Sequence, residues 1–225
     1  MNSGIIVAGG KSERMGLDVD KAFLSLGSKP VVVYSLLAFE KCPDVDEVVL
    51  VVRKERVEAA RCATQIFGCK KVIKVVAGGG QRQQSVMNGL AEISPGAEVV
   101  AVHDGARPCV TADLISETIK SARLYGSGVA AVKMTDTVKE ASKAMTISKT
   151  IDRTKLWRVQ TPQAFKADLI RKAFEQVNKK KCKITDEASA VELICDGVRL
   201  VPSSSSNIKI TSPDDLVLAA ALMRL

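Results

Sequence analysis

The run Gly4-Ile5-Ile6-Val7-Ala8-Gly9-Gly10-Lys11-Ser12-Glu13-Arg14-Met15-Gly16 sets the architecture that we expect of this chain. It begins as an apolar segment of strand length and turns at once into two adjacent glycines. Because glycine has no Cβ, the backbone N–H groups of Gly9 and Gly10 can come close to a ligand. The run therefore predicts a strand followed by a phosphate-binding loop, with an ordinary strand-to-helix turn as the alternative. Three cations add positive charge beside this loop, at Lys11, Arg14 and Lys21.

Two common phosphate-binding motifs do not fit the spacing of these glycines. A dinucleotide fingerprint requires G-x-G-x-x-G after the strand, and Gly9, Gly10 and Gly16 do not form it. A P-loop requires G-x-x-x-x-G-K-[ST], but Ile5 occupies the position of its first glycine. The loop is therefore expected to differ from those of P-loop ATPases and dinucleotide-binding proteins.

Strand and helix patterns alternate from the opening loop to about residue 132. Alternation at these intervals is typical of βαβ units, so it predicts an α/β protein with a mostly parallel, doubly wound sheet. Ligands of such sheets bind beyond the carboxyl ends of the strands. The polar loops 8–21, 78–85 and 103–108 all fall there, which favours a nucleotide-sized site. The predicted strands are 47–52, 71–76, 98–102 and 128–132, and the predicted helices are 30–42, 54–67, 81–93 and 111–125.

The alternation stops between residues 134 and 159. Two short segments there, 135–139 and 147–152, predict a β-hairpin that protrudes as an arm. Arms of this kind commonly pair with a second subunit. Beyond the arm we expect helices at 166–178 and from Thr185, strands at 198–201 and 207–210, and a final helix capped by Ser212 with Pro213 at its first position.

The composition is that of one globular domain extending over residues 1–225. The net charge is +8, but the basic residues are spread along the chain and only 4% of residues are aromatic, so no nucleic-acid partner is expected. Small polyanionic substrates suit this charge better. No apolar segment approaches the roughly 18 residues that span a bilayer, so no membrane partner is expected either. The six cysteines lack metal spacing and no signal-peptide pattern is visible, which predicts a cytoplasmic protein with reduced, mostly buried thiols.

Two neighbouring residues, His103 and Asp104, follow a predicted strand next to the phosphate loop. His103 is the single histidine of the chain, and its place at a strand end favours an orienting or structural role over catalysis. Asp104 is placed to help hold Mg²⁺ or a ribose hydroxyl, because Mg²⁺ takes one or two carboxylates plus substrate phosphates. The alternative is a carboxylate that merely leads into the next helix. Lys209 lies between two isoleucines and would point either inward to an anion or outward to solvent.

These residue types suit one kind of reaction. When an already anionic phosphate attacks a nucleoside triphosphate, the nucleophile needs no general base, and the protein neutralises charge and aligns the groups. Arg14, Lys21 and Lys209 supply the charge for such a reaction, and the sequence offers no candidate base beside them.

Short motifs spread over essentially the whole chain support this interpretation. They are Ala8-Gly9-Gly10…Arg14-Met15, Lys21, Gly78-Gly79…Arg82…Ser85-Val86, His103-Asp104…Ala106-Arg107-Pro108, Asp136-Thr137-Val138-Lys139, Asp152-Arg153, Thr161-Pro162-Gln163-Ala164-Phe165, Thr185-Asp186-Glu187-Ala188-Ser189 and Asn207-Ile208-Lys209. Together they closely resemble the 2-C-methyl-D-erythritol 4-phosphate cytidylyltransferases of the non-mevalonate isoprenoid pathway. The resemblance implies a Rossmann-like nucleotidyltransferase fold with a dimerisation arm at about 134–158. It also implies transfer of CMP from CTP to methylerythritol 4-phosphate by a homodimer, with Mg²⁺ or another divalent cation.

The resemblance further implies roles for individual residues. Arg14 and Lys21 would stabilise the charge that builds on the α-phosphate, and Lys209 would join them near the metal-bound phosphates. Thr137, Arg153 and Thr161 would hold the sugar phosphate, with Arg153 delivered from the arm of a second subunit. The nucleotide-binding residues would be Ala8, Gly9, Gly79 and Ser85 around the cytosine, Gly10 beside them, and Asp104, Gly105 and Arg107 along the ribose and triphosphate, with Asp104 as the metal ligand.

Three positions depart from the family pattern: Asp20 replaces a usual proline, Gly80 an acidic residue, and Gly105 an alanine. Two other functions stay open. The related ribitol 5-phosphate cytidylyltransferases share the nucleotide half, but they differ over the stretch that corresponds to Thr185-Asp186-Glu187-Ala188-Ser189. A non-catalytic nucleotide-binding protein on the same fold is the second alternative, because a fold alone does not determine activity.

Overall fold

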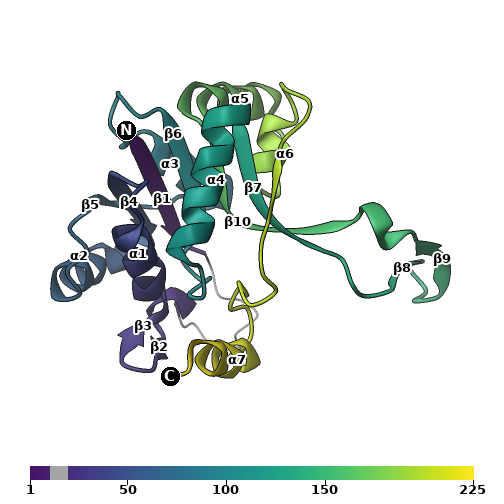
Figure 1. Cartoon of the computed structure of the whole chain (residues 1–225), viewed down its shortest axis with the longest axis horizontal. Helices are drawn as coiled ribbons and strands as arrows, with labels where there is room; N and C mark the ends of the chain where they lie inside the picture. The colour runs from purple at the N-terminus through teal and green to yellow at the C-terminus, as the bar shows by residue number, and fades with distance from the viewer. Residues whose placement is uncertain (11–19) are drawn as a thin grey trace.

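The computed structural model describes residues 1–10 and 20–225; residues 11–19, which include the predicted catalytic Arg14, lie outside the described residues. A seven-stranded sheet in the order β11-β7-β10-β6-β1-β4-β5 forms the centre of the protein (Figure 1). The sheet is mostly parallel, as predicted, and β10 is the one described strand that runs against its neighbours. Its strands are β1 (Asn2–Ala8), β4 (Glu47–Val52), β5 (Val72–Ala77), β6 (Val99–Asp104), β7 (Ser127–Lys133), β10 (Trp157–Lys166) and β11 (Leu200–Pro202).

The apolar run of β1 contributes to the core on both faces of the sheet. Successive residues of a strand point to opposite faces. Ile5 and Val7 therefore join one hydrophobic cluster, whereas Ile6 and Ala8 join the other. Helices α1 (Val31–Lys41), α2 (Val57–Ile66) and α4 (Ala112–Tyr125) cover the face of Ile6, and α3 (Arg82–Leu90), α5 (Ala167–Lys180) and α6 (Glu187–Val191) cover the face of Ile5. Helices thus cover both faces of the sheet, as expected for the predicted doubly wound architecture.

The central strand β10 is the main element that the sequence analysis missed. Its residues from Gln160 to Phe165 are buried between β6 and β7. Pro162 lacks a backbone N–H and is disfavoured in a central strand, so the sequence of this segment does not predict a strand. The structure accommodates the proline where the pairing with β7 shifts register, between Val159 and Gln163.

Two features near the C-terminus correct the sequence analysis, and a third confirms it. The predicted strand at 207–210 is wrong, because these residues form a loop that runs beside residues 106–107. Ile210 N–H donates to the carbonyl of Ala106 at 2.8 Å, and this contact holds the loop at the carboxyl end of the sheet. Helix α6 begins at Glu187 with Asp186 as its cap, not at Thr185. The final helix α7 (Pro213–Met223) has the capping box of Ser212 and Asp215, which confirms the predicted start.

The predicted hairpin is present. Strands β8 (Val138–Ala141) and β9 (Ile147–Ile151) pair antiparallel, and Figure 1 shows them on an arm that extends far from the rest of the chain. A second small hairpin, β2 (Ser25–Leu26) with β3 (Lys29–Pro30), lies beside α7.

All six cysteines are free thiols. The prediction that most of them are buried is wrong: Cys42 and Cys69 are buried, whereas the other four are half-buried or exposed. Within residues 1–10 and 20–225, no helix is long and apolar enough to cross a membrane.

Candidate active site

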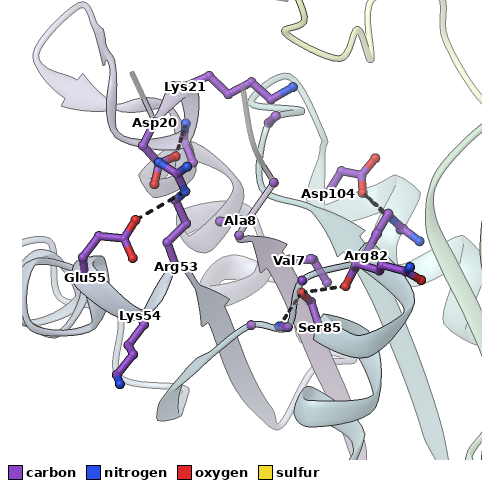
Figure 2. A pocket seen from close by; sticks show the side chains of 18 of the residues that line it. Val7, Ala8, Asp20, Lys21, Arg53, Lys54, Glu55, Arg82, Ser85 and Asp104 are labelled. Carbon is purple, nitrogen blue, oxygen red and sulfur yellow. Dashed lines mark hydrogen bonds and ion pairs between the residues drawn. The ribbon is translucent and has the colours of Figure 1, made fainter. Parts of the chain in front are cut away.

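A cavity of about 540 Å³ opens at the carboxyl ends of β1, β4 and β6. Figure 2 shows Asp20 and Arg53 on one side of it, and Arg82 and Asp104 on the other. Two short 3-10 helices complete the wall, η2 (Lys21–Phe23) and η3 (Lys54–Arg56). The cavity lies at the edge where the sequence predicts a nucleotide-sized site. The predicted site residues that line it are Ala8, Gly9, Gly10, Lys21, Gly79, Ser85, Asp104 and Lys209.

The glycine turn after β5 is shaped by the first turn of α3. A Cβ on Gly79 would lie 2.4 Å from Cβ of Gln84, and one on Gly78 would lie 2.7 Å from Oγ of Ser85. Gly79 N–H donates to Ser85 Oγ at 3.1 Å, and the Ser85 hydroxyl donates to the carbonyl of Gln81 at 3.3 Å (Figure 2). Glycine is therefore required by close packing here, and this packing leaves bare backbone along the cavity wall.

A second cavity of about 250 Å³ adjoins the first. Arg107 and Thr161, both predicted site residues, line this second cavity. Arg82, Asp104 and Lys209 line both cavities and therefore form the wall between them. Two ligands that occupied the two cavities would meet at these three side chains.

Asp104 is surrounded by cations. Its Oδ1 accepts from Nε of Arg82 at 3.1 Å, its Oδ2 accepts from Nζ of Lys209 at 2.7 Å, and Nε of Arg107 lies 3.9 Å from Oδ2. Burial alone would raise the pKa of Asp104, but the charges of Arg82, Lys209 and Arg107 outweigh it and hold the pKa well below its usual range. The three cations therefore favour the ionised form of the carboxylate.

Arg82 is itself held by a buried carboxylate. Its Nη1 lies 2.5 Å from Oε1 of Glu187 and its Nη2 lies 3.0 Å from Oε2, and Glu187 is fully buried. Burial would lower the pKa of Arg82, but Glu187 and Asp104 together raise it above its usual range. The sequence analysis gave neither residue a site role, since Arg82 and Glu187 were each named only as members of a family motif.

The orientation of Lys209, which the sequence left open, follows from the loop that carries it. Asn207 is buried, and its Nδ2 donates to the carbonyl of Thr161 at 2.9 Å and to Oε1 of Gln160 at 3.1 Å. Arg107 Nη1 donates to the carbonyl of Asn207 at 2.8 Å. With its preceding residues anchored in this way, Lys209 points inward to Asp104 instead of to solvent.

His103 lies inside the fold, behind the site. It is fully buried against the ring of Phe39, with ring centroids 5.5 Å apart. Asp104 N–H donates to Thr161 Oγ1 at 3.0 Å, and this hydroxyl lies 3.1 Å from Nδ1 of His103. Nε2 of His103 lies 3.3 Å from the carbonyl of Arg107, so the network assigns the proton to Nε2. Burial lowers the pKa of His103 to about 3, which fits the predicted structural role.

Asp20, which replaces the usual proline, is buried at the start of η2. Its Oδ1 accepts from Ala22 N–H at 3.2 Å and caps η2, and its Oδ2 lies 4.0 Å from Nε of Arg56. Burial raises the pKa of Asp20. The carboxylate thus caps the turn that carries Lys21.

Three predicted site residues in the described part of the chain, Gly105, Thr137 and Arg153, line neither of the two cavities. Gly105 is buried, and its N–H donates to the carbonyl of Val7 at 2.9 Å. Thr137 and Arg153 are exposed on the arm, where Nη1 of Arg153 lies 2.5 Å from the carbonyl of Thr135.

Arg53 and Lys54 line the first cavity, although the sequence analysis gave neither a site role. Both follow directly after the buried strand β4, and this position was the indication that the sequence offered.

A doubly wound sheet whose carboxyl edge carries two joined cavities and a carboxylate ringed by cations has the arrangement of a nucleotide-binding α/β protein. Family comparison is more specific. Residues 3–225 match the family model of 2-C-methyl-D-erythritol 4-phosphate cytidylyltransferase (IspD), and the chain belongs to this family. The sequence-based identification of the family is therefore confirmed.

Relatives and solved structures agree with this assignment. The chain is 39% identical over 221 residues to the 2-C-methyl-D-erythritol 4-phosphate cytidylyltransferase of Alkaliphilus oremlandii. This alignment covers 98% of this chain and 94% of that protein. It is 41% identical over 221 residues to the enzyme of the same name from Pelotomaculum thermopropionicum, covering 98% and 93%. Among solved structures, the 4-diphosphocytidyl-2C-methyl-D-erythritol synthase of Anaerococcus prevotii superposes with a TM-score of 0.86 at 30% identity, covering 99% of this chain and 98% of that one. The Rossmann-like nucleotidyltransferase fold is thereby confirmed.

Proposed function

We propose that this chain transfers CMP from CTP to 2-C-methyl-D-erythritol 4-phosphate and releases pyrophosphate. The product is 4-diphosphocytidyl-2-C-methyl-D-erythritol. The observation that carries this proposal is the wall shared by the two cavities, because Arg82, Asp104 and Lys209 lie where two substrates would meet. Family membership supplies the identity of the two substrates.

The larger cavity is the proposed CTP site. The bare backbone of Gly9, Gly10 and Gly79 suits a flat base and a triphosphate, and Lys21 adds positive charge near the phosphates. The smaller cavity is the proposed acceptor site, with Thr161 and Arg107 in its lining.

The proposed reaction needs no general base. A phosphate oxygen of the acceptor attacks the α-phosphorus of CTP, the bond to the β-phosphate breaks, and pyrophosphate leaves with that electron pair. Because the acceptor phosphate is already anionic, the chain's part is to align it and to neutralise the charge at the α-phosphate. Lys21 and Lys209 serve this purpose in the proposal, together with Arg14.

The residues of the site fit a divalent cation. Among the described residues, Asp104 is the one carboxylate that lines both cavities. It is ionised, and one carboxylate plus substrate phosphates is a usual ligand set for Mg²⁺. When bound, Mg²⁺ neutralises charge on the triphosphate. We therefore propose Mg²⁺ as the cofactor and Asp104 as its protein ligand.

The arm suggests the assembly. Met145 and Ile147 are 87% and 66% exposed on it, and Arg153 is exposed and lines neither cavity of its own chain. We propose a cytoplasmic homodimer in which residues 1–225 form one catalytic domain and the arm at about 134–158 brings Arg153 and Thr137 to the acceptor cavity of the other subunit. Light scattering on a chain with residues 138–151 replaced by a short turn tests this, and a dimer of unchanged stability and activity would contradict it.

Pyrophosphate release tests the reaction. The purified chain is supplied with CTP and Mg²⁺, and 2-C-methyl-D-erythritol 4-phosphate is compared with ribitol 5-phosphate as acceptor. Turnover with the first alone is expected. A preference for ribitol 5-phosphate would show that the chain is a ribitol 5-phosphate cytidylyltransferase. CTP binding without turnover of either acceptor would favour a non-catalytic role.

A further inference from the structure

Glu187 is a fully buried carboxylate that faces the candidate site from behind. The first turn of α6, which carries it, is fixed to β10 by Gln163. Oε1 of Gln163 accepts from Ala188 N–H at 2.8 Å, and its Nε2 donates to Oδ2 of Asp186 at 2.9 Å. Glu187 thus has a fixed backbone, and its side chain points toward Arg82.

The contact between Glu187 and Arg82 determines the plane of the guanidinium. Both carboxylate oxygens are engaged, at 2.5 Å from Nη1 and 3.0 Å from Nη2 of Arg82. A two-point contact of this kind orients as well as attracts. In this orientation Nε of Arg82 donates to Oδ1 of Asp104 at 3.1 Å, and Nη2 lies 3.1 Å from the same oxygen.

The two partners of Asp104 differ in how easily they could leave it. On Oδ1, Arg82 is anchored to a carboxylate with no exposed surface, and a buried ion left without its partner is costly. On Oδ2, Lys209 has a flexible side chain that is 35% exposed. Arg82 is therefore the fixed partner, and Lys209 is the partner that can exchange onto an incoming phosphate.

We propose that Glu187 is a positioning residue for the transfer reaction: through Arg82 it fixes Asp104 at the wall between the two cavities, so that Lys209 alone changes partner when substrates bind. This inference rests on the proposed function. Glu187 lines neither cavity, so it would affect catalysis only through Arg82 and Asp104.

A second buried carboxylate shows that burial alone does not require such an arrangement. Glu47 is 3% exposed at the start of β4, at the opposite end of the strands from the cavities. Neutral donors satisfy it: Ser3 Oγ at 2.6 Å, with the backbone N–H and hydroxyl of Ser94. Glu187 is paired instead with a cation that reaches into the site, and Glu47 is the matched control.

The test compares Glu187→Gln, Arg82→Gln, the double variant Arg82→Gln/Glu187→Gln and the control Glu47→Gln. Arg82→Gln leaves the buried carboxylate of Glu187 without its cation, and Glu187→Gln removes one of the two carboxylates that hold Arg82, so both are expected to lower the melting temperature. The double variant removes both charges and should regain much of that loss. Its kcat should nevertheless stay about tenfold or more below wild type, because Asp104 has lost its fixed partner.

Equilibrium binding separates positioning from a general loss of structure. The affinity for CTP without acceptor should stay within about threefold of wild type in Glu187→Gln, because Glu187 lines neither cavity and the glycine-lined part of the CTP cavity is unchanged. Glu47→Gln should lose stability and keep kcat.

Two results would overturn the inference. One is a double variant that regains wild-type kcat together with its melting temperature, which would make the pair purely structural. The other is a loss of kcat in Glu47→Gln equal to that in the double variant. The wild-type assay with CTP and both acceptors is run alongside, so a failure of the proposed function would appear as absent wild-type turnover and would be distinguished from a failure of this inference.

Discussion

Nζ of Lys209 lies 2.7 Å from Oδ2 of Asp104, although 105 positions separate the two residues in the chain. This contact joins the loop before the last helix to the carboxyl end of β6, and it lies on the wall between the two cavities. The ammonium group of Lys209 can pair with the carboxylate of Asp104 before substrates bind, and with a substrate phosphate after they bind. The contact therefore connects the folded state to the proposed transfer chemistry.

Substitution of Lys209 tests that connection. Lys209→Gln removes a charge from the point where the substrates meet, so kcat is expected to fall by about 10²-fold, in the range seen when a group that stabilises developing charge is lost. Steady-state pyrophosphate release measures it. Lys74→Gln is the control, since Lys74 pairs with Glu92 at 2.6 Å on the edge strand β5 and should leave kcat unchanged. A kcat for Lys209→Gln equal to that of the control would contradict the proposed role.

Lys21 is expected to matter for turnover and not for folding. It begins η2 and lines the larger cavity. Lys21→Ala should reduce kcat by about 10²- to 10³-fold while the melting temperature stays close to wild type. The half-buried Lys29, which lies over the ring of Tyr34 at 5.5 Å and lines neither cavity, supplies the matched Lys29→Ala control. Near-normal kcat in Lys21→Ala would show that the charge at this position is not used.

The close packing of the glycine turn can be tested by a single methyl group. Gly79→Ala places a Cβ 2.4 Å from Cβ of Gln84, so the turn or α3 must move. We expect a stability loss of about 1–3 kcal/mol in urea denaturation and weaker CTP binding. Gly96→Ala is the control, because a Cβ there meets no atom of the described residues within 4 Å. Equal effects of the two substitutions would contradict the packing argument.

His103 predicts how stability depends on pH. Burial lowers its pKa to about 3 from a usual value of 6.5, so the folded protein keeps the ring neutral while the unfolded chain binds a proton. The unfolded state thus binds more protons below pH 6.5, and stability is lost as pH falls from 6.5 toward 3, with a limiting slope of about 1.4 kcal/mol per pH unit.

Urea denaturation between pH 7 and pH 5 measures this slope. His103 is the only histidine, so few other groups titrate in that window. His103→Gln cannot take up the proton, and its free energy of unfolding should change less over the same range. Parallel curves for the two proteins would show that His103 does not govern the acid side of stability.

Much of the sheet could be predicted from local sequence. The bounds of the strand at 47–52 match β4, and the caps at Thr111 and Ser212 begin α4 and α7 as predicted. These features depend on neighbours in the chain: apolar runs, hydrogen bonds to the first helical turn, and glycine turns. The predicted edge of the sheet carries the cavities for the same reason, because the carboxyl ends of parallel strands lie together.

Tertiary structure alone decided the rest. Strand β10 looks unlike a strand because of Pro162, and only its burial between β6 and β7 makes it one. The inward direction of Lys209 depends on Asn207 and Arg107, and the role of Arg82 depends on Glu187, 105 positions away. Periodicity and capping report what a residue does with its neighbours in the chain, whereas the partner of a buried charge is set by which distant segments the fold brings within 3 Å. The sequence by itself therefore determined most of the parallel strands, the helix caps and the family, and the folded chain determined the strand β10 and which charges meet at the site.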